Sequence, residues 1–313
     1  MYINSRANKL AKILTVLIPV FAFTILVPSF ENPIEARTGE VLGATTQTIN
    51  NQLDKADFVV SQPYKIHFDQ TLPENSRATL AYDLKTGKVL LERNGDLKVQ
   101  TASLTKLLTS IVASEEPNFK QPIQINSEDH TLIKPILGLR NGDMVLPEEL
   151  INAMLVGSAN DAAITLANHF GGTEGFVVKM NKKAAELGMI NSHFDNPVGF
   201  DSANNFSTAF DLKKLTEYAL KNLPYDQVWK TENFYFKTAH GAYSLKNSNT
   251  LITTHPEIKS IKTGLTPLAL GNMIVQAENA LGDKIVVINL GSTNRNNSTL
   301  EAVNYVFSSF AWK

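Results

Sequence analysis

The sequence predicts an α/β fold of the α+β type: one antiparallel sheet made from both ends of the region 76–313, with a mostly helical insert. Short apolar runs with strand character stand at residues 78–91 and return at 258–290, whereas the segment between them carries apolar residues at helical spacing. One sheet assembled from two distant chain segments, with the inserted helices packed against it, buries both kinds of element economically.

The first thirty residues differ from the rest of the chain. Three basic residues, Arg6, Lys9 and Lys12, precede an apolar run at 13–27. This order is typical of an export signal, and the basic flank predicts that the remainder of the chain faces outward. The run is short for a bilayer span, which needs about twenty residues. Residues 1–30 are therefore predicted to be a signal peptide or a signal anchor of an extracytoplasmic protein.

Membrane attachment through an uncleaved N-terminal segment is slightly favoured over cleavage. Ile34 and Leu42 stand three residues before the two candidate cuts, where a small residue is needed. Cleavage would instead leave a secreted or periplasmic enzyme. Residues 31–75 show little periodicity and predict a linker and extended lead-in. The catalytic domain is expected at 76–313.

The catalytic domain is expected to open with a hairpin and to continue into helices. Lys85-Thr86-Gly87 joins two short apolar runs and predicts the hairpin turn. Pro147 suits the first position of a helix, and Thr173 is the expected N-cap of another. The expected helices are 103–112, 147–156, 160–170, 174–187 and one from Ser207 or Thr208 to about Leu220.

Strand character returns near the C-terminus. The expected strands are 258–262, 272–278 and 284–290, with Gly282-Asp283 in the turn between the last two. A terminal helix should follow, because Leu300, Val303, Val306 and Phe307 lie at helical spacing. These strands and the hairpin would supply the two halves of the sheet.

Composition excludes several classes of protein. A net charge of −1 gives no bulk electrostatic reason to expect nucleic-acid binding. The chain has no Cys, which excludes disulfides and thiolate metal sites. Its six His are scattered, with no pair at ligand spacing, so neither a metal nor a cofactor is expected.

A nucleophile and its base are predicted in Ser103-Leu104-Thr105-Lys106. Residues three apart on a helix share a face, so Lys106 can reach the Ser103 hydroxyl, which is a weak nucleophile without an adjacent base. A lysine acts as a base only when neutral, and partial burial together with a nearby cation such as Lys262 would lower its pKa. Near the helix start, unpaired backbone N–H groups favour a developing negative charge.

Two further motifs follow in order, Ser158-Ala159-Asn160 and Lys262-Thr263-Gly264. With the Ser-x-x-Lys element they predict active-serine acyl transfer. Each motif alone is weak, because Lys85-Thr86-Gly87 and Ser202-Ala203-Asn204 repeat two of them; we interpret the first as a hairpin turn and the second as a loop before a helix. Ser-x-x-Lys occurs only once in the chain, at Ser103. The prediction rests on the order of the three motifs along the sequence.

The motifs belong to a longer resemblance that runs from about Ser76 to Phe310. The chain resembles the serine D-alanyl-D-alanine carboxypeptidases, low-molecular-mass penicillin-binding proteins of peptidase family S11, in a short form without the C-terminal domain. The resemblance implies the DD-peptidase/β-lactamase-like fold, with the active site at the seam between sheet and helices. The matching stretches are Ala81–Leu90, Thr101–Lys106, Ser158–Ala163, Met180-Asn181, Leu187–Met189, Asn196–Phe200, Ser207–Ala209, Asn247–Leu251 and Lys262–Thr266.

The resemblance implies hydrolysis of the terminal D-Ala from peptidoglycan stem pentapeptides. Ser103 would form an acyl-enzyme after Lys106 removes its proton, and Ser158 would relay a proton to the departing amine. The backbone N–H groups of Ser103 and Leu265 would form the oxyanion hole. β-Lactams are the expected inhibitors, since they would acylate the same hydroxyl.

Substrate binding is assigned to the remaining motif residues. Asn160 would hold the substrate's peptide group, while Lys262 and Thr263 suit a terminal carboxylate by charge and by hydroxyl donation. Gly264 would leave room for the substrate along the strand edge. Arg295 corresponds to a basic position that helps hold the carboxylate, although a solvated loop arginine is an equal alternative.

The sequence also departs from the family pattern. After Lys-Thr-Gly-x-Thr the family usually has Ala-Gly, whereas here Leu270 separates Ala269 from Gly271. The shape of the turn beside the strand is therefore in question.

Three other functions remain as alternatives. A DD-endopeptidase that cuts peptidoglycan cross-links would need the same acylating group. A class A β-lactamase would add a Glu on a loop after the second motif, and no Glu-x-x-Leu-Asn stands there. A non-catalytic module that binds the wall or β-lactams would not need the intact nucleophile and base.

Overall fold

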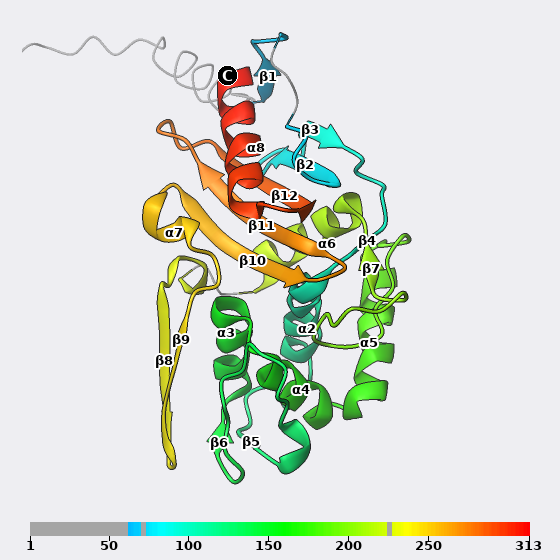
Figure 1. Cartoon of the computed structure of the whole chain (residues 1–313), viewed down its shortest axis with the longest axis vertical. Helices are drawn as coiled ribbons and strands as arrows, with labels where there is room; N and C mark the ends of the chain where they lie inside the picture. The colour runs from blue at the N-terminus through cyan, green and yellow to red at the C-terminus, as the bar shows by residue number, and fades with distance from the viewer. Residues whose placement is uncertain (1–61, 70–72, 224–226) are drawn as a thin grey trace, which may run out of the picture. The chain divides into compact units, whose positions relative to one another are not determined.

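A computed structural model of the chain describes residues 62–69, 73–223 and 227–313 (Figure 1). The predicted signal segment at 1–30 and most of the predicted linker at 31–75 lie outside the described residues. Within the described ranges, no helix is both long and apolar enough to cross a bilayer.

The centre of the domain is a five-stranded antiparallel sheet with the order β10-β11-β12-β2-β3. Its strands come from both ends of the catalytic region, which confirms the predicted fold class. Antiparallel neighbours joined by short turns explain the pairs β2–β3, β10–β11 and β11–β12, while β12 pairs with β2 across the insert. The strands are β2 (Ala78–Asp83), β3 (Val89–Arg93), β10 (Ile258–Thr266), β11 (Leu270–Glu278) and β12 (Lys284–Ser292).

Both faces of the sheet are covered, so successive side chains enter two different cores. In β12, Ile285 and Val287 pack toward α8 (Arg295–Ser309), whereas Val286 and Ile288 pack toward the inserted helices. Figure 1 shows α8 on one side of the sheet and the insert on the other. The apolar run of β12 is continuous because both of its faces are buried.

The insert is built around α2 (Thr105–Ser114), which has nine buried residues. Around it lie α3 (Pro147–Gly157), α4 (Asn160–His169), α5 (Gly172–Glu186) and α6 (Ala209–Asn222). The short elements that connect them are β4 (Val99–Gln100), η1 (Ala102–Leu104), β5 (Ile123–Gln124), η2 (Ser127–Asp129), β6 (Met144–Val145) and β7 (Phe206–Ser207).

Most helix boundaries follow the sequence signals, but the helix expected at 103–112 starts as the 3-10 turn η1, and α2 itself begins at Thr105. Pro147 is the first residue of α3, and the Thr208 hydroxyl caps α6 by accepting from Asp211 N at 3.1 Å. The expectation that Thr173 caps α5 is wrong, because α5 begins at Gly172. Gly171 and Gly172 both have positive φ (134° and 74°), so the chain turns into the helix two residues earlier than expected, with Gly171 at the N-cap position.

Several elements have no counterpart in the sequence predictions. Strands β8 (Asn233–Thr238) and β9 (Gly241–Lys246) form a separate hairpin between η3 (Val228–Lys230) and α7 (Leu251–Thr254). Within the predicted lead-in, β1 (Pro63–Lys65) pairs with β13 (Phe310–Trp312) at the end of α8.

Candidate active site

Ser103 and Lys106 meet at the junction of η1 and α2. Lys106 Nζ donates to Ser103 Oγ at 2.9 Å and to the carbonyl oxygen of Val198 at 2.7 Å, and the lysine side chain is fully buried. The predicted helical spacing therefore places the two side chains in contact, with Ser103 in the 3-10 turn that leads into α2.

Burial and the neighbouring Lys262 ammonium hold the pKa of Lys106 well below its ordinary value, although the Asp161 carboxylate opposes them. A neutral amine has a lone pair that can accept the proton of the Ser103 hydroxyl. The arrangement is therefore chemically able to activate Ser103 as a nucleophile.

The loop at 196–200 supports this pair. Asn196 Oδ1 accepts from the backbone N–H groups of Val198, Gly199 and Phe200, at 3.2, 2.7 and 3.0 Å. The loop thereby presents the Val198 carbonyl to Lys106 and lays Gly199 against the Ala102 backbone. Val198 and Gly199 lie in the matching stretch Asn196–Phe200, but the sequence alone does not indicate these contacts.

Ser158 lies in the turn between α3 and α4, where it adopts left-handed backbone angles (φ 61°, ψ 29°). Such a conformation is uncommon for a residue with a side chain and often marks a functional position. Its Oγ accepts from Lys262 Nζ at 3.0 Å, and both side chains are buried. The turn thus brings the second and third motifs into direct contact.

Lys262 extends from β10, the edge strand of the sheet, and also donates to the carbonyl oxygen of Thr263 at 2.9 Å. Burial and the nearby Arg295 guanidinium lower the pKa of Lys262 to about 7. Its charge therefore changes close to neutral pH.

Asn160, the first residue of α4, is held by the loop that precedes β6. Its backbone N–H donates to Pro135 O and its Nδ2 donates to Ile133 O, both at 2.8 Å. Its Oδ1 is buried and accepts no hydrogen bond from any described residue. An unpaired buried acceptor of this kind suits an N–H group of a bound ligand.

Next to Asn160, the Asp161 carboxylate fixes the same loop by accepting from the backbone N–H groups of residues 137, 138 and 139. Asp161 therefore both shapes the loop and acts on the pKa of Lys106.

Arg295 is not a solvated loop residue. It is the first residue of α8 and donates to Gly264 O at 3.0 Å and to Ser248 O at 3.1 Å. Ser248 in turn exchanges a hydrogen bond with the Thr263 hydroxyl, with 2.6 Å between the two oxygens. Arg295 and Ser248 thus brace the strand that carries Lys262 and Thr263. Ser248 lies in the matching stretch Asn247–Leu251, but no role could be assigned to it from the sequence.

Gly264 is required by the serine turn itself. A Cβ at this position would lie 3.0 Å from both Ala102 Cβ and Ser103 N. The absence of a side chain lets β10 approach Ser103 closely, one residue before Leu265, whose own side chain is 68% exposed.

The unusual turn after Thr266 is accommodated by Leu270, which takes a left-handed φ of 58°. Asp201 holds the turn by accepting from Thr266 Oγ1 at 2.5 Å and from Leu268 N at 3.1 Å. Thr266 and Leu270 remain opposite each other in the β10–β11 pair. The extra residue therefore alters the turn but not the strand that carries the motif.

Both repeated motifs lie outside this arrangement. Lys85-Thr86-Gly87 forms the β2–β3 turn, where Thr86 N and Oγ1 donate to Asp83. Ser202 lies in the loop before α6 and donates to Asp195. Within the described ranges, no group of three or more His, Asp or Glu side chains could hold a metal ion.

Comparison with known proteins places the chain among relatives. A family profile for D-alanyl-D-alanine carboxypeptidases matches residues 67–293. A D-alanyl-D-alanine carboxypeptidase of Bacillus subtilis is 28% identical over 251 residues, 76% of this chain and 64% of the relative. A D-alanyl-D-alanine endopeptidase of Pseudomonas aeruginosa is 35% identical over 199 residues, 61% of this chain and 63% of that protein.

Comparison with solved structures agrees with the comparison of sequences. The crystal structure of the Streptomyces K15 DD-transpeptidase is similar with a TM-score of 0.71 and 27% identity, covering 77% of this chain and all of that one. This chain spans slightly less than two thirds of the Bacillus subtilis relative. Since the profile covers most of the described domain, the chain belongs to the D-alanyl-D-alanine carboxypeptidase family.

Proposed function

We propose that the protein is a serine-type D-Ala-D-Ala carboxypeptidase that removes the terminal D-Ala from peptidoglycan stem pentapeptides. The observation that carries the proposal is the contact between Ser103 Oγ and the buried Lys106 amine at 2.9 Å, beside a second buried lysine on an edge strand. A nucleophile with a neutral base and a nearby cation suits an acyl donor that ends in a carboxylate.

In the first step, Ser103 Oγ attacks the carbonyl carbon between the two D-alanines while its proton passes to Lys106. The peptide C–N bond then breaks, the proton on Lys106 passes by way of Ser158 to the departing amine, and free D-Ala leaves. Water hydrolyses the resulting ester, which returns the Ser103 hydroxyl and releases a peptide shortened by one residue. The backbone N–H groups of Ser103 and Leu265 stabilise the developing oxyanion, a contribution of about 10²–10³ in rate per donor.

Substrate binding uses the groups around β10. The Lys262 ammonium and the Thr263 hydroxyl hold the terminal carboxylate, and the substrate backbone lies along the strand beside Gly264. The unpaired Oδ1 of Asn160 accepts a hydrogen bond from an N–H group of the substrate. Arg295 acts on the carboxylate indirectly, because its two hydrogen bonds go to Gly264 O and Ser248 O. β-Lactams would acylate Ser103 in place of the peptide.

The proposed location is extracytoplasmic, with attachment to the membrane through residues 1–30. The basic residues followed by the apolar run at 13–27 support this location. N-terminal sequencing of the mature protein tests it: an intact N-terminus in the membrane fraction supports retention, whereas a start near Arg37 or Thr45 in the soluble fraction contradicts it.

A DD-endopeptidase is the second candidate, and the resemblance to the Pseudomonas aeruginosa endopeptidase favours keeping it. The two activities differ in the leaving group: in a cross-link, the scissile bond joins D-Ala to the side-chain amine of a neighbouring stem peptide and not to a terminal D-Ala. A peptide ending in D-Ala-D-Ala should release D-alanine, and the same peptide amidated at its C-terminus should react poorly. Equal kcat/KM for both peptides would favour the endopeptidase.

The decisive experiment combines this assay with mass spectrometry after brief penicillin exposure. The wild-type protein should gain one adduct and Ser103→Ala none. A stable adduct without D-alanine release would indicate a non-catalytic module, and rapid loss of the adduct with turnover of penicillin would indicate a β-lactamase.

A further inference from the structure

Exposed apolar side chains gather at the end of the domain where α8 finishes. Tyr64, Ile66 and Phe68 are 38%, 42% and 77% exposed, and Leu281 in the β11–β12 turn is 87% exposed. Trp312 in β13 is partly exposed. We name this surface, made by Tyr64, Ile66, Phe68, Leu281 and Trp312, the α8 end. Figure 1 shows β1, the last turn of α8 and the β11–β12 turn at the same end of the domain.

The pairing of β1 with β13 turns part of this surface outward. Pro63 lies opposite Trp312, and Lys65 lies opposite Phe310, which is buried in the core beneath α8. Side chains alternate between the two faces of a strand pair, so Tyr64 points to the other, solvent side. Lys65 Nζ lies 5.5 Å from the Phe68 ring centroid and 5.8 Å from the Tyr305 ring centroid.

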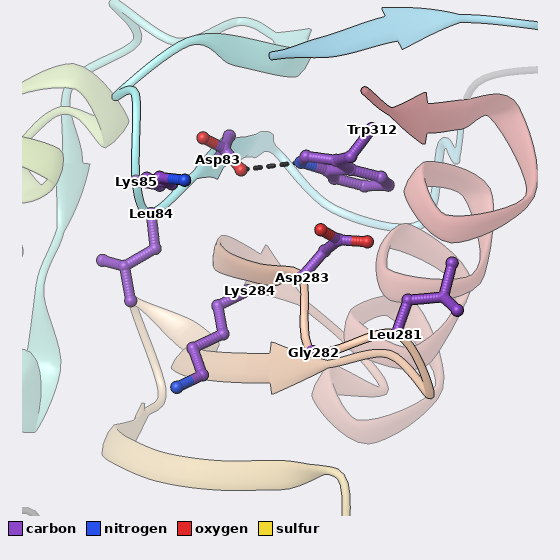
Figure 2. A pocket seen from close by; sticks show the side chains of 8 residues that line it. All are labelled: Asp83, Leu84, Lys85, Leu281, Gly282, Asp283, Lys284 and Trp312. Atoms are coloured by element: carbon purple, nitrogen blue, oxygen red, sulfur yellow. Dashed lines mark hydrogen bonds between the residues drawn. The ribbon is translucent and has the colours of Figure 1, made fainter. Parts of the chain in front are cut away.

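A hollow beside Trp312 places charged groups of both signs next to the apolar ones (Figure 2). Leu281 and Trp312 border it, and its charged lining consists of Lys85, Lys284, Asp83 and Asp283. Lys284 Nζ lies 3.7 Å from the Glu278 carboxylate, and Asp283 accepts from Asn279 Nδ2 at 2.9 Å, whereas the Lys85 side chain is exposed. Asp83 is already occupied, because its Oδ1 accepts from Trp312 Nε1 at 2.8 Å and its Oδ2 accepts from Thr86. A rim of aromatic and aliphatic side chains with adjacent ammonium groups suits the headgroup region of an anionic lipid layer.

The α8 end lies far from the catalytic serine. Arg295, at the first residue of α8, contacts the strand that carries Lys262, and the helix runs for 15 residues before β13. At a rise of 1.5 Å per residue this helix spans about 22 Å. Contact through the α8 end would therefore leave the active site turned away from the lipid.

We propose that the α8 end docks on the surface of an anionic phospholipid bilayer. This inference rests on the membrane attachment proposed above and extends it from a tether to a defined orientation. The covalent connection supports the choice of occupant: residues 1–61, which include the apolar run at 13–27, lead directly into the segment that forms β1. Tethering near a surface raises the effective concentration of that surface at the linked domain.

The absence of Cys allows a direct test with single-Cys variants of the full chain. An environment-sensitive fluorophore is attached at Phe68→Cys or Leu281→Cys. Matched controls are Val178→Cys and Ile190→Cys, because these side chains are similarly exposed (68% and 84%) but belong to the helical insert. In phosphatidylglycerol-containing vesicles, the labels at 68 and 281 should shift to shorter wavelength and brighten, while the control labels should not.

A second test reverses the charge of lysines at the α8 end. Lys85 lines the hollow, and Lys313 Nζ lies 5.2 Å from the Tyr64 ring centroid. Lys85→Glu with Lys313→Glu should lower the ratio of docked to undocked protein about 25-fold or more, because each lysine near an anionic surface contributes roughly fivefold. Lys120→Glu with Lys237→Glu makes the same change of net charge with exposed lysines of the insert and of β8, and should leave the ratio unchanged. Vesicles of phosphatidylcholine alone should give little shift in any variant.

Flotation with the vesicles and D-alanine release are measured on the same samples. A chain that floats and releases D-alanine while the labels at 68 and 281 stay unshifted overturns the docking and leaves the proposed function intact. Equal shifts at 68, 281, 178 and 190, or failure to float with anionic vesicles, also overturn it. Loss of D-alanine release with the expected fluorescence shifts contradicts the proposed enzyme activity alone.

Discussion

Gly199 lies directly against the carbonyl oxygen of Ala102: a Cβ placed on Gly199 would be 1.8 Å from that oxygen. Both residues have positive φ, 90° at Gly199 and 48° at Ala102. Ala102 immediately precedes Ser103, so the loop at 196–200 determines where the nucleophile is held as well as where Lys106 finds its second acceptor.

Gly199→Ala should therefore impair acylation strongly. The new methyl group must displace the Ala102 backbone, and a shift of about 1 Å at a reacting group can cost on the order of 10² in rate. The rate of penicillin acylation, followed by intact-protein mass spectrometry, should fall by at least about that factor.

Gly188→Ala is the matched control for backbone strain. Gly188 also has a positive φ (71°), but nothing lies within 4 Å of the site of its Cβ. This variant should lose about 1 kcal/mol of unfolding free energy and keep its acylation rate. Similar acylation rates for both variants would show that the contact with Ala102 is dispensable.

Lys106→Ala should abolish acylation without unfolding the domain. The variant removes the base, which typically contributes about 10²–10⁴ in rate, and it also removes a buried amine whose charged form is disfavoured there. Penicillin adduct formation and thermal unfolding together check this. In the wild-type protein, acidification should slow acylation, because protonation of Lys106 removes the lone pair that accepts the Ser103 proton.

The repeated motifs offer a test of the assignment itself. Lys85→Ala and Ser202→Ala should acylate at the wild-type rate, because the first is in the β2–β3 turn and the second donates only to Asp195 in a loop. Ser103→Ala should give no adduct. An adduct that persists in Ser103→Ala would mean that another hydroxyl is the nucleophile.

The sheet and the inserted helices could be predicted because their apolar periodicity is long and regular. β1 and β13 could not, since each has three residues and their partner lies at the other end of the chain. The β8–β9 hairpin does not stand out in the sequence, because its strands pair only with each other and each has a single buried residue, Phe236 in β8 and Tyr243 in β9.

In the candidate site too, contacts within one element could be predicted, whereas contacts between distant segments could not. The contact of Ser103 with Lys106 follows from helical spacing, and the lowered pKa of Lys106 follows from burial and a nearby cation, as expected from the residue types. The Val198 carbonyl and Ser248 depend on backbone positions far away in sequence, which no local pattern specifies. The turn at Leu270 keeps the strand register despite the insertion, because Asp201 supplies hydrogen bonds from outside the motif.

The charge of Lys262 should set the alkaline limit of carboxypeptidase activity. Its pKa is lowered to about 7, so the ammonium that binds the carboxylate is present below that pH and is lost above it. For a peptide ending in D-Ala-D-Ala, kcat/KM should therefore decline above about pH 7, provided that Lys106 is already neutral there. The amidated peptide, which has no carboxylate to bind, should show no such decline.

Arg295 allows the cause of this pH dependence to be tested. Burial is the larger cause of the lowered pKa of Lys262, and the Arg295 guanidinium is the second. Arg295→Gln removes that cation, so Lys262 should keep its proton to higher pH and the decline in kcat/KM should begin at higher pH. Arg295→Lys retains a positive charge and should leave the midpoint near its wild-type value, even if lost hydrogen bonds to Gly264 O and Ser248 O lower kcat/KM at every pH. An unmoved midpoint in Arg295→Gln, measured from about pH 5 to about pH 10, would assign the alkaline limb to a group other than Lys262.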